Sequence, residues 1–271
     1  METTVHRIPV DPGVRLYVEE TGTGPALILI HGLTLDRRMW ADQIAPFAAG
    51  HRVLACDVRG FGLSDPALPS QPYTHAADLK AVLDYFGIKR ATLLGLSMGG
   101  WPAVDFALAY PEATAALILV DSTLYGYEFE PGYGGRLQSL FDTWPRDPSA
   151  ARVAWLADPL FAGSHGNSAT VARLTEMVEE CNAFQLTQPY ADPHIQPAVP
   201  VIDRLGEITA PTLVMVGRAD IPDFHRISRI LHEGIPGSRY LILENAGHMC
   251  NMDNPTAFNE AVLSFLSDHP T

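Results

Sequence analysis

Short runs of almost wholly apolar residues recur along this chain of 271 residues, and segments with helical spacing separate them. Each run is far too short to span a membrane and suits a strand that is buried on both faces. The runs that we expect to be strands are Ala26–Ile30, Arg52–Cys56, Ala91–Leu96, Ala115–Val120, Thr212–Val216 and Tyr240–Leu243. Because strands that alternate with helices need crossover connections, the sequence predicts an α/β fold with a mainly parallel central sheet and helices on both faces.

The connecting segments show where the helices should lie. Apolar spacing predicts helices over Arg38–Ala48, His75–Phe86, Met98–Tyr110 and Pro255–Ser267. Near the N-terminus, Val14–Glu20 alternates apolar and polar residues, which is typical of an edge strand with one solvated face. These elements together provide enough apolar surface for one large core.

The stretch 122–206 breaks this alternation, because it contains no convincing buried strand. Helices are expected at Gly135–Thr143, Ser149–Ala157 and Ser168–Cys181, with turns rich in proline and glycine between them. A helical insertion between two parallel strands is typical of a lid over the carboxyl ends of the strands, where such sheets bind ligands. We therefore predict a core domain of residues 1–121 and 207–271, and a helical cap of residues 122–206.

Charge and cysteine content narrow the classes of partner. The formal net charge of −13 would repel phosphate backbones and anionic lipid, so neither nucleic acid nor a membrane is an expected partner. Residues 1–10 lack the apolar stretch of a signal peptide, and the three cysteines have no metal-ligand spacing. We expect a cytoplasmic protein with a small-molecule substrate, without a metal or another cofactor; a homodimer is one open possibility.

One strand-to-helix connection carries a serine among glycines. The segment Gly95–Gly100 reads Gly-Leu-Ser-Met-Gly-Gly and follows the expected strand Ala91–Leu96. A turn this sharp strains the serine backbone and requires small residues at Gly95 and Gly99, where other backbone approaches closely. The turn holds the Ser97 hydroxyl at the N-terminus of a helix, which favours developing negative charge. Ser97 is therefore the predicted nucleophile.

A serine hydroxyl is a weak nucleophile, so a base must accept its proton. Among ten histidines, His248 lies in the loop after the expected strand Tyr240–Leu243, and Gly247 lets this loop turn tightly. We predict His248 as the base. A partner carboxylate raises the pKa of the imidazole and burial lowers it, so we expect a pKa of roughly 6 to 7.5.

The acid that orients this imidazole is expected on the loop after the preceding strand, Thr212–Val216. Asp220 has the best spacing from the end of that strand and is the predicted acid. Asp121, at the end of another core strand, is the main alternative, and Asp223 and Asp203 remain open.

Acyl transfer also needs hydrogen-bond donors for the oxyanion of the tetrahedral intermediate. The backbone N–H of Met98, directly after the nucleophile, is one expected donor. Leu33 is the second, because it lies in the loop after Ala26–Ile30 and the neighbouring Gly32 allows a close approach. His31 is expected to make structural hydrogen bonds.

The cap is rich in aromatic residues, which suggests an apolar pocket of moderate size. We predict substrate contacts from Trp101, early in the nucleophile helix, and from Tyr125 and Trp144 of the cap. The cap also carries arginines that could pair with a substrate carboxylate but are expected to be solvated: Arg136, Arg152 and Arg173.

Together these motifs resemble the α/β-hydrolase superfamily over nearly the whole chain outside the cap. The residues that carry the resemblance are His31-Gly32, the run Asp57–Asp65, the turn around Ser97, the loop Gly217–Asp220 and Gly247-His248. The resemblance implies the chain order serine, acid, histidine. It also implies that Asp57–Asp65 is structural, with Arg59 and Asp65 tying the loop down.

Within the superfamily the chain is most similar to esterases, 3-oxoadipate enol-lactonases and carbon–carbon bond hydrolases. Ser97 stands where haloalkane dehalogenases and epoxide hydrolases carry an aspartate, which argues against those two activities.

The leading hypothesis is a serine hydrolase that cleaves a small carboxylic ester or lactone through an acyl-Ser97 intermediate. A second hypothesis keeps the same triad but cleaves a carbon–carbon bond next to a ketone, or catalyses a non-hydrolytic step of secondary metabolism. A third is a non-catalytic ligand-binding protein on a hydrolase scaffold. The complete set of Ser97, Asp220 and His248 argues against the third, because a receptor has no physical need for it.

Overall fold

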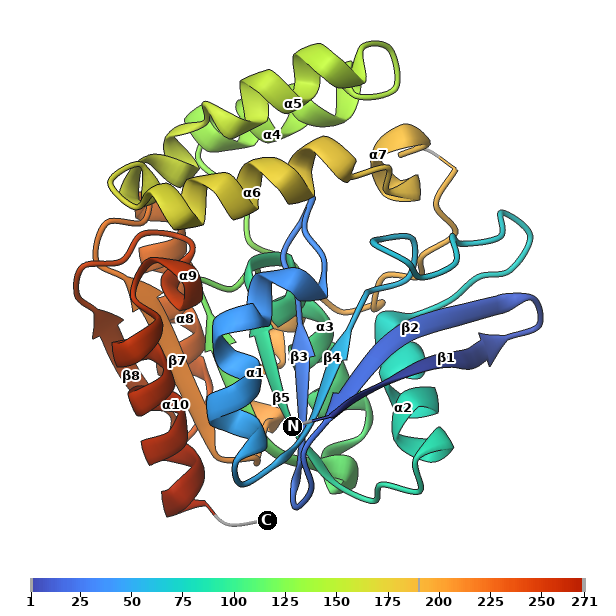
Figure 1. Ribbon diagram of the computed structural model, residues 1–271, viewed down its shortest axis with the longest axis vertical. Coiled ribbons are helices and arrows are strands. Elements are labelled where there is room, and N and C mark those ends of the chain that lie inside the picture. Colours follow the sequence, from blue (N-terminus) through green and yellow to red (C-terminus); the bar gives the residue numbers. More distant parts are fainter. Residues whose placement is uncertain (1, 190, 270–271) are drawn as a thin grey trace.

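An eight-stranded sheet runs through the computed structural model, which describes residues 2–189 and 191–269 (Figure 1). Its strand order is β1-β2-β4-β3-β5-β6-β7-β8. The strands are β1 (Thr3–Asp11), β2 (Val14–Thr21), β3 (Ala26–Ile30), β4 (Arg52–Cys56), β5 (Ala91–Leu96), β6 (Thr114–Val120), β7 (Thr212–Gly217) and β8 (Arg239–Leu243). The pairs β1–β2 and β2–β4 are antiparallel and the other pairs are parallel, which confirms the predicted mainly parallel sheet.

Helices cover the sheet on both sides. In Figure 1, α1 (Ala41–Ala48) and α10 (Pro255–Asp268) pack together in front of the sheet, and α3 (Gly100–Ala109) lies behind it. On that far side α2 (His75–Tyr85) packs against α3, and α8 (Pro222–Gly234) packs against β7. The shorter helices of this part are η1 (Arg37–Trp40), η2 (Ser97–Gly99), η3 (Pro111–Ala113) and α9 (Cys250–Asp253). Within the described ranges, no helix combines the length and the apolar character that crossing a membrane requires.

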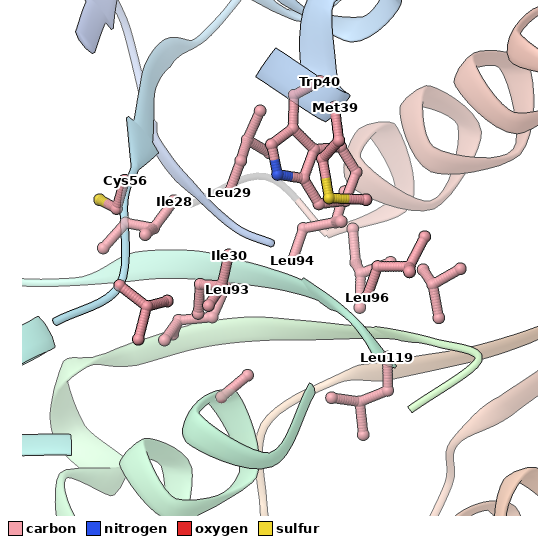
Figure 2. Packing of buried hydrophobic residues seen from close by; sticks show 14 of the residues in the cluster. Ile28, Leu29, Ile30, Met39, Trp40, Cys56, Leu93, Leu94, Leu96 and Leu119 are labelled. Atoms are coloured by element: carbon pink, nitrogen blue, oxygen red, sulfur yellow. The ribbon is translucent and has the colours of Figure 1, made fainter. Parts of the chain in front are cut away.

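The core lies on both faces of the central strands. All five residues of β3 are buried, because β4 and β5 flank the strand and helices cover its two faces. Figure 2 shows Leu29, Leu94 and Leu96 beside Met39 and Trp40 of η1. Full burial of a large apolar side chain contributes about 1.5–3 kcal/mol, so this packing gives the strand ends that carry the site a rigid support.

The cap joins β6 to β7 and lies over the carboxyl ends of the parallel strands (Figure 1). It contains α4 (Pro131–Thr143), α5 (Pro148–Leu156), η4 (Pro159–Ser164), α6 (Ser168–Glu180), α7 (Phe184–Thr187), η5 (Val201–Asp203) and η6 (Leu205–Glu207). The three helices predicted for this stretch correspond to α4, α5 and α6. The division into a core domain and a cap domain stays a prediction.

The N-terminal edge of the sheet differs from the sequence-based expectation. Val14–Glu20 was expected at the edge, but β2 lies between β4 and a further strand, β1. Only Ile8 of β1 is fully buried, so the strand has too few inward apolar residues to be recognised by periodicity. The hairpin turn at Pro12-Gly13, where Gly13 has a φ of 84°, brings β1 onto β2.

The loop after β4 is held by buried ionic contacts. Arg59 is 1% exposed, and its guanidinium donates to Asp78 at 2.8 Å and to Asp11 at 2.6 Å. The Asp65 carboxylate accepts the backbone N–H of Arg15 at 2.8 Å. These contacts agree with the structural role that the resemblance implied for this loop.

Candidate active site

The connection from β5 to α3 holds Ser97 in a strained conformation. Its φ is 55°, in the left-handed region that non-glycine residues rarely adopt. A Cβ on Gly95 would lie 2.2 Å from the carbonyl oxygen of Gly99, and one on Gly99 would lie 2.2 Å from that of Ile30. Both positions therefore require glycine, as the sequence predicted. The Ser97 carbonyl also accepts the backbone N–H of Thr123 at 2.9 Å, which fixes the turn from a second side.

The structure brings the three predicted side chains together at the carboxyl ends of β5, β7 and β8. The Nε2 of His248 lies 2.9 Å from Ser97 Oγ, and its Nδ1 lies 2.8 Å from Asp220 Oδ2. Because Nδ1 faces a carboxylate, it carries the ring proton and donates a hydrogen bond to Asp220. Nε2 is then the free acceptor that faces the Ser97 hydroxyl.

The imidazole is in a strongly desolvated position. His248 is 2% exposed. Burial lowers its pKa to about 4, against the opposing effect of the nearby carboxyl groups of Asp121, Asp253 and Asp158. The sequence-based expectation was that the effects of burial and of the partner carboxylate on the pKa partly cancel; in the structure burial has the larger effect. His248 is therefore neutral at pH 7, as a proton acceptor must be.

The alternative acids have other partners. The Asp121 side chain accepts the backbone N–H of Gly217 at 2.8 Å, and no direct hydrogen bond joins it to His248 in the described structure. Asp223 accepts the Tyr127 hydroxyl at 3.0 Å and the backbone N–H of Glu130 at 2.9 Å. Asp203 lies in η5 of the cap. Of the four aspartates, Asp220 is the one that contacts the imidazole.

The two predicted oxyanion donors lie next to the serine. Leu33 and Met98 line the same cavity as Ser97, and a Cβ on Gly32 would lie 3.4 Å from the Ser97 Cβ. In the part of the chain that the structure describes, the Leu33 amide has no protein acceptor. The Met98 amide is in the first turn of η2, where backbone N–H groups have no acceptor within the helix.

His31 makes hydrogen bonds that hold the loop of Gly32 and Leu33. Its Nε2 accepts the backbone N–H of Val58 at 2.9 Å, so its Nδ1 carries the proton and donates to the carbonyl of Gly32 at 2.8 Å. The ring is fully buried, and burial lowers its pKa. This is the structural role that was expected for His31.

A cavity of about 440 Å³ opens above Ser97, between the sheet and the cap. Trp101 lines it, as predicted. The apolar part of the lining comes mainly from Leu33, Leu35, Phe61, Leu96, Tyr133, Leu137, Phe141, Trp155, Leu160 and Phe161. Hydrophobic walls around a single polar reaction centre are typical of small-molecule sites.

The two cap aromatics predicted to touch substrate lie elsewhere. Trp144 has no exposed surface and lies inside the cap, where the Arg152 guanidinium is 5.1 Å from its ring centre. Tyr125 is half-buried in the segment that enters the cap, and its carbonyl accepts the backbone N–H of Ile202. Neither residue lines the cavity: Trp144 belongs to the buried core, and Tyr125 is partly buried against that core. The number of aromatic residues in the cap could not show which of them pack in the core and which line the cavity.

Several polar lining residues were not found from the sequence. They are His75 at the start of α2, Gln138 of α4, Gln185 of α7, and Asp192, His194 and Gln196 of the segment that leaves the cap. The rings of His75 and His194 stack with centroids 4.7 Å apart, and Trp101 meets both edge-on. Burial lowers the pKa of His194 to about 4 and that of His75 well below its usual range. Both imidazoles are therefore neutral, and no local motif marks them.

The described part of the lining contains no lysine and no arginine. The three cap arginines have protein partners, which differs from the expectation that they are solvated. Arg136 pairs with Asp158 at 2.6 Å and Arg173 pairs with Asp42 at 2.6 Å. Arg152 donates to the backbone carbonyls of Val178 and Cys181.

Among the residues that the structure describes, one group has the spacing of metal ligands. Oxygen and nitrogen atoms of Asp121, Asp220 and His248 all lie within 4.8 Å of one another. The Asp220 and His248 atoms already bond to each other, and His248 also faces Ser97. We therefore assign Asp220 and His248 to the hydrogen-bonded chain that ends at Ser97, and assign no metal to the group.

Comparison with known proteins identifies the family to which the chain is similar. Residues 25–255 match the family model described as alpha/beta hydrolase fold. The 2-hydroxy-6-oxononadienedioate/2-hydroxy-6-oxononatrienedioate hydrolase of Cupriavidus pinatubonensis is 31% identical over 267 residues, which cover 95% of this chain and 92% of that protein.

Solved structures give the same result. A thermophilic esterase from Thermogutta terrifontis aligns over the whole of both chains with a TM-score of 0.81 and 26% identity. An N-acyl homoserine lactone degrading enzyme aligns over 96% of this chain and 100% of its own, with a TM-score of 0.78 and 26% identity.

Proposed function

This chain belongs to the α/β-hydrolase family, and from that premise we propose that it hydrolyses a small, uncharged carboxylic ester or lactone through an acyl-Ser97 intermediate. The observation that carries the proposal is the continuous chain from Ser97 Oγ through His248 to Asp220, with spacings of 2.9 and 2.8 Å, at the floor of an apolar cavity. Such a chain activates a serine for attack on an acyl carbon.

In the first half-reaction, Ser97 Oγ attacks the carbonyl carbon while its proton moves to His248 Nε2. The carbonyl π electrons move to the oxygen, and the amides of Leu33 and Met98 stabilise the resulting oxyanion. When the oxyanion collapses, the bond to the leaving oxygen breaks. That oxygen takes the proton from His248, which leaves an acyl-Ser97 ester and an alcohol; for a lactone both remain one molecule.

In the second half-reaction, water takes the place of the serine as nucleophile. His248 Nε2 accepts a proton from the water, the hydroxide attacks the acyl carbon, and the bond to Ser97 Oγ breaks as the serine regains its proton. The products are the free enzyme and a carboxylic acid. Asp220 stabilises the imidazolium in both halves and keeps the ring oriented.

The charge of the lining supports an uncharged substrate. Within the described lining, no cation is present to pair with a carboxylate, and the one acidic residue is Asp192. Moving a carboxylate into an apolar cavity without a partner costs several kcal/mol. The neutral imidazoles of His75 and His194 can hydrogen bond to a polar group but supply no charge at neutral pH.

Carbon–carbon bond hydrolysis is the second candidate, and the 31% identity to the hydrolase of Cupriavidus pinatubonensis favours it. The name of that enzyme describes a substrate with two carboxylates. The cation-free lining of this chain is a poor match for such a dianion, so we rank ester or lactone hydrolysis first.

A substrate panel tests this ranking. The panel contains two activated esters of equal acyl length, one ending in a methyl group and the other in a carboxylate. The third substrate is 2-hydroxy-6-oxo-6-phenylhexa-2,4-dienoate, whose hydrolysis breaks a carbon–carbon bond. Ser97→Ala is the control in every assay. We expect the methyl-ended ester to have a kcat/KM at least about tenfold above that of its carboxylate match. Faster turnover of the dienoate than of every neutral ester would overturn the proposal in favour of carbon–carbon hydrolysis.

A further inference from the structure

Asp121 is a fully buried acid that the reaction sequence above does not use. It follows the last residue of β6 and has a φ of 42°, which is uncommon for a residue with a side chain. One of its oxygens, Oδ1, accepts the backbone N–H of Gly217 at 2.8 Å. The other oxygen, Oδ2, is buried and has no donor within the described structure. An ionised oxygen in that position would lack any partner for its charge.

Asp220 has the opposite hydrogen-bond pattern. Its Oδ1 accepts the backbone N–H of Ile221 at 2.7 Å, and its Oδ2 accepts His248 Nδ1–H at 2.8 Å. A carboxyl oxygen of Asp121 lies within 4.8 Å of one of Asp220, and both side chains are buried. Two buried carboxyl groups this close share one proton at neutral pH, because two adjacent negative charges in a medium of low polarity repel each other. The oxygen without a donor, Asp121 Oδ2, is the place for that proton.

We propose that Asp121 is protonated in the resting enzyme and donates its Oδ2–H to the ionised Asp220. Asp121 then acts as a positioning residue: it holds the Asp220 carboxylate against His248 without adding a second negative charge. The inference rests on the proposed function only for its kinetic consequence; the protonation itself is a property of the folded protein.

The electrostatics agree with this assignment. Burial raises the pKa of Asp121 well above its usual range, and the negative charge of Asp220 raises it further. Burial also raises the pKa of Asp220, but there the hydrogen bonds from Asp121 and from the Ile221 N–H act in the opposite direction. Both oxygens of Asp220 accept a hydrogen bond, whereas Asp121 accepts the Gly217 N–H through Oδ1 alone.

Other titratable groups face this pair from the surrounding elements. They are Asp223 of α8, Tyr133 of α4, Asp158 next to η4, and Cys250 and Asp253 of α9. Among the described residues, the Cys250 thiol is the other side-chain donor that faces Asp121, and its sulfur also lies 3.5 Å from the carbonyl of Gly247. A thiol is a weak donor, so it does not replace the proton on Asp121.

A negative charge on Asp121 would have a measurable effect on the pKa of His248. An ionised carboxylate within 4.8 Å of the ring would raise the imidazole pKa by on the order of two units at an effective dielectric constant of about 20. A protonated Asp121 produces no such shift. The pH dependence of kcat/KM in Asp121 variants therefore distinguishes a protonated Asp121 from an ionised one.

Three variants separate these cases, with kcat/KM measured on a neutral activated ester across the acidic limb. Asp121→Asn keeps an acceptor for Gly217 and supplies an N–H to Asp220. The midpoint of its kcat/KM profile should therefore stay within about 0.3 pH units of that of the parent, and kcat/KM should fall by less than about tenfold. Asp121→Leu removes the donor and leaves Asp220 more basic, so its midpoint should rise by about one unit. Cys250→Ala removes the weak thiol donor that faces Asp121 and should leave the midpoint in place.

A direct spectroscopic measurement accompanies the kinetics and does not depend on turnover. The infrared difference spectrum of parent minus Asp121→Asn at pH 7 should contain the carbonyl stretch of a protonated carboxylic acid, with both proteins shown to be folded by near-ultraviolet circular dichroism. A missing band, or an Asp121→Asn midpoint lower by a unit or more, would overturn the proposal, because either result means that Asp121 is ionised. If the band is present but no ester is hydrolysed, the proposed function fails and the protonation stands.

Discussion

Replacing Asp220 with asparagine tests how the site activates Ser97. The substitution keeps the size of the side chain but removes the negative charge that lies 2.8 Å from His248 Nδ1. An asparagine can also turn its N–H₂ group toward the ring, which places the ring proton on Nε2, the atom that must accept the proton of Ser97. Both effects act on the transition state, so kcat should fall more than KM rises.

The geometry gives the size of the effect. With the centres of charge roughly 4 Å apart and an effective dielectric constant of about 20, the attraction between carboxylate and imidazolium is about 4 kcal/mol. That energy corresponds to about three orders of magnitude in rate, and the wrong tautomer adds to the loss. We therefore expect Asp220→Asn to lower kcat/KM by about 10³ to 10⁴.

The assay is hydrolysis of a neutral activated ester at pH 8, with thermal unfolding to show that each variant is folded. Asp121→Asn is the matched comparison, because it changes a neighbouring buried acid that does not bond to the imidazole. If Asp220→Asn kept more than about a tenth of the parent activity while Asp121→Asn lost several orders of magnitude, the acid would be Asp121 and the reasoning would be refuted.

Three further predictions concern the pH profile, a buried residue of the cap and a residue of the cavity wall. Because burial lowers the pKa of His248 and the base must be neutral, kcat/KM should rise with pH through a midpoint below about 6.5 and then level off; a midpoint above about 7 would contradict the dominance of burial. Trp144→Ala should destabilise the protein by about 3–5 kcal/mol in denaturant unfolding, because a fully buried indole is lost. Trp101→Ala, which alters the cavity itself, should instead raise KM for the preferred ester; a larger KM effect from Trp144→Ala would place that residue in the binding site.

The parts of the site that the sequence could predict are those fixed by backbone geometry. Gly95 and Gly99 have no room for a Cβ, so the nucleophile turn has a local pattern that can be read directly. His248 and Asp220 follow strands that are recognisable as apolar runs, and the parallel sheet brings the ends of these strands to one edge. The local sequence therefore predicts Ser97 and His248, whereas it favoured Asp220 as the acid but left Asp121, Asp223 and Asp203 open.

The cavity lining could not be predicted in the same way. His194 and Gln185 reach it from segments without a motif, and their positions depend on how the cap folds back over the sheet. Trp144 and Tyr125 are aromatic, as pocket residues often are, yet their side chains pack in or against the hydrophobic core. The strand β1 was missed because an antiparallel edge strand with one buried apolar residue has almost no periodic signal.

Covalent labelling at Ser97 tests the central claim most directly. The folded protein is treated with a fluorophosphonate at pH 8, and the modified peptide is identified by mass spectrometry, with Ser97→Ala and His248→Ala as controls. An activated serine predicts one phosphonyl group per chain, located on Ser97, with loss of ester hydrolysis in proportion to labelling, no label in Ser97→Ala and strongly slowed labelling in His248→Ala. Labelling of a different residue, or full ester hydrolysis after Ser97 is blocked, would contradict the acyl-Ser97 mechanism.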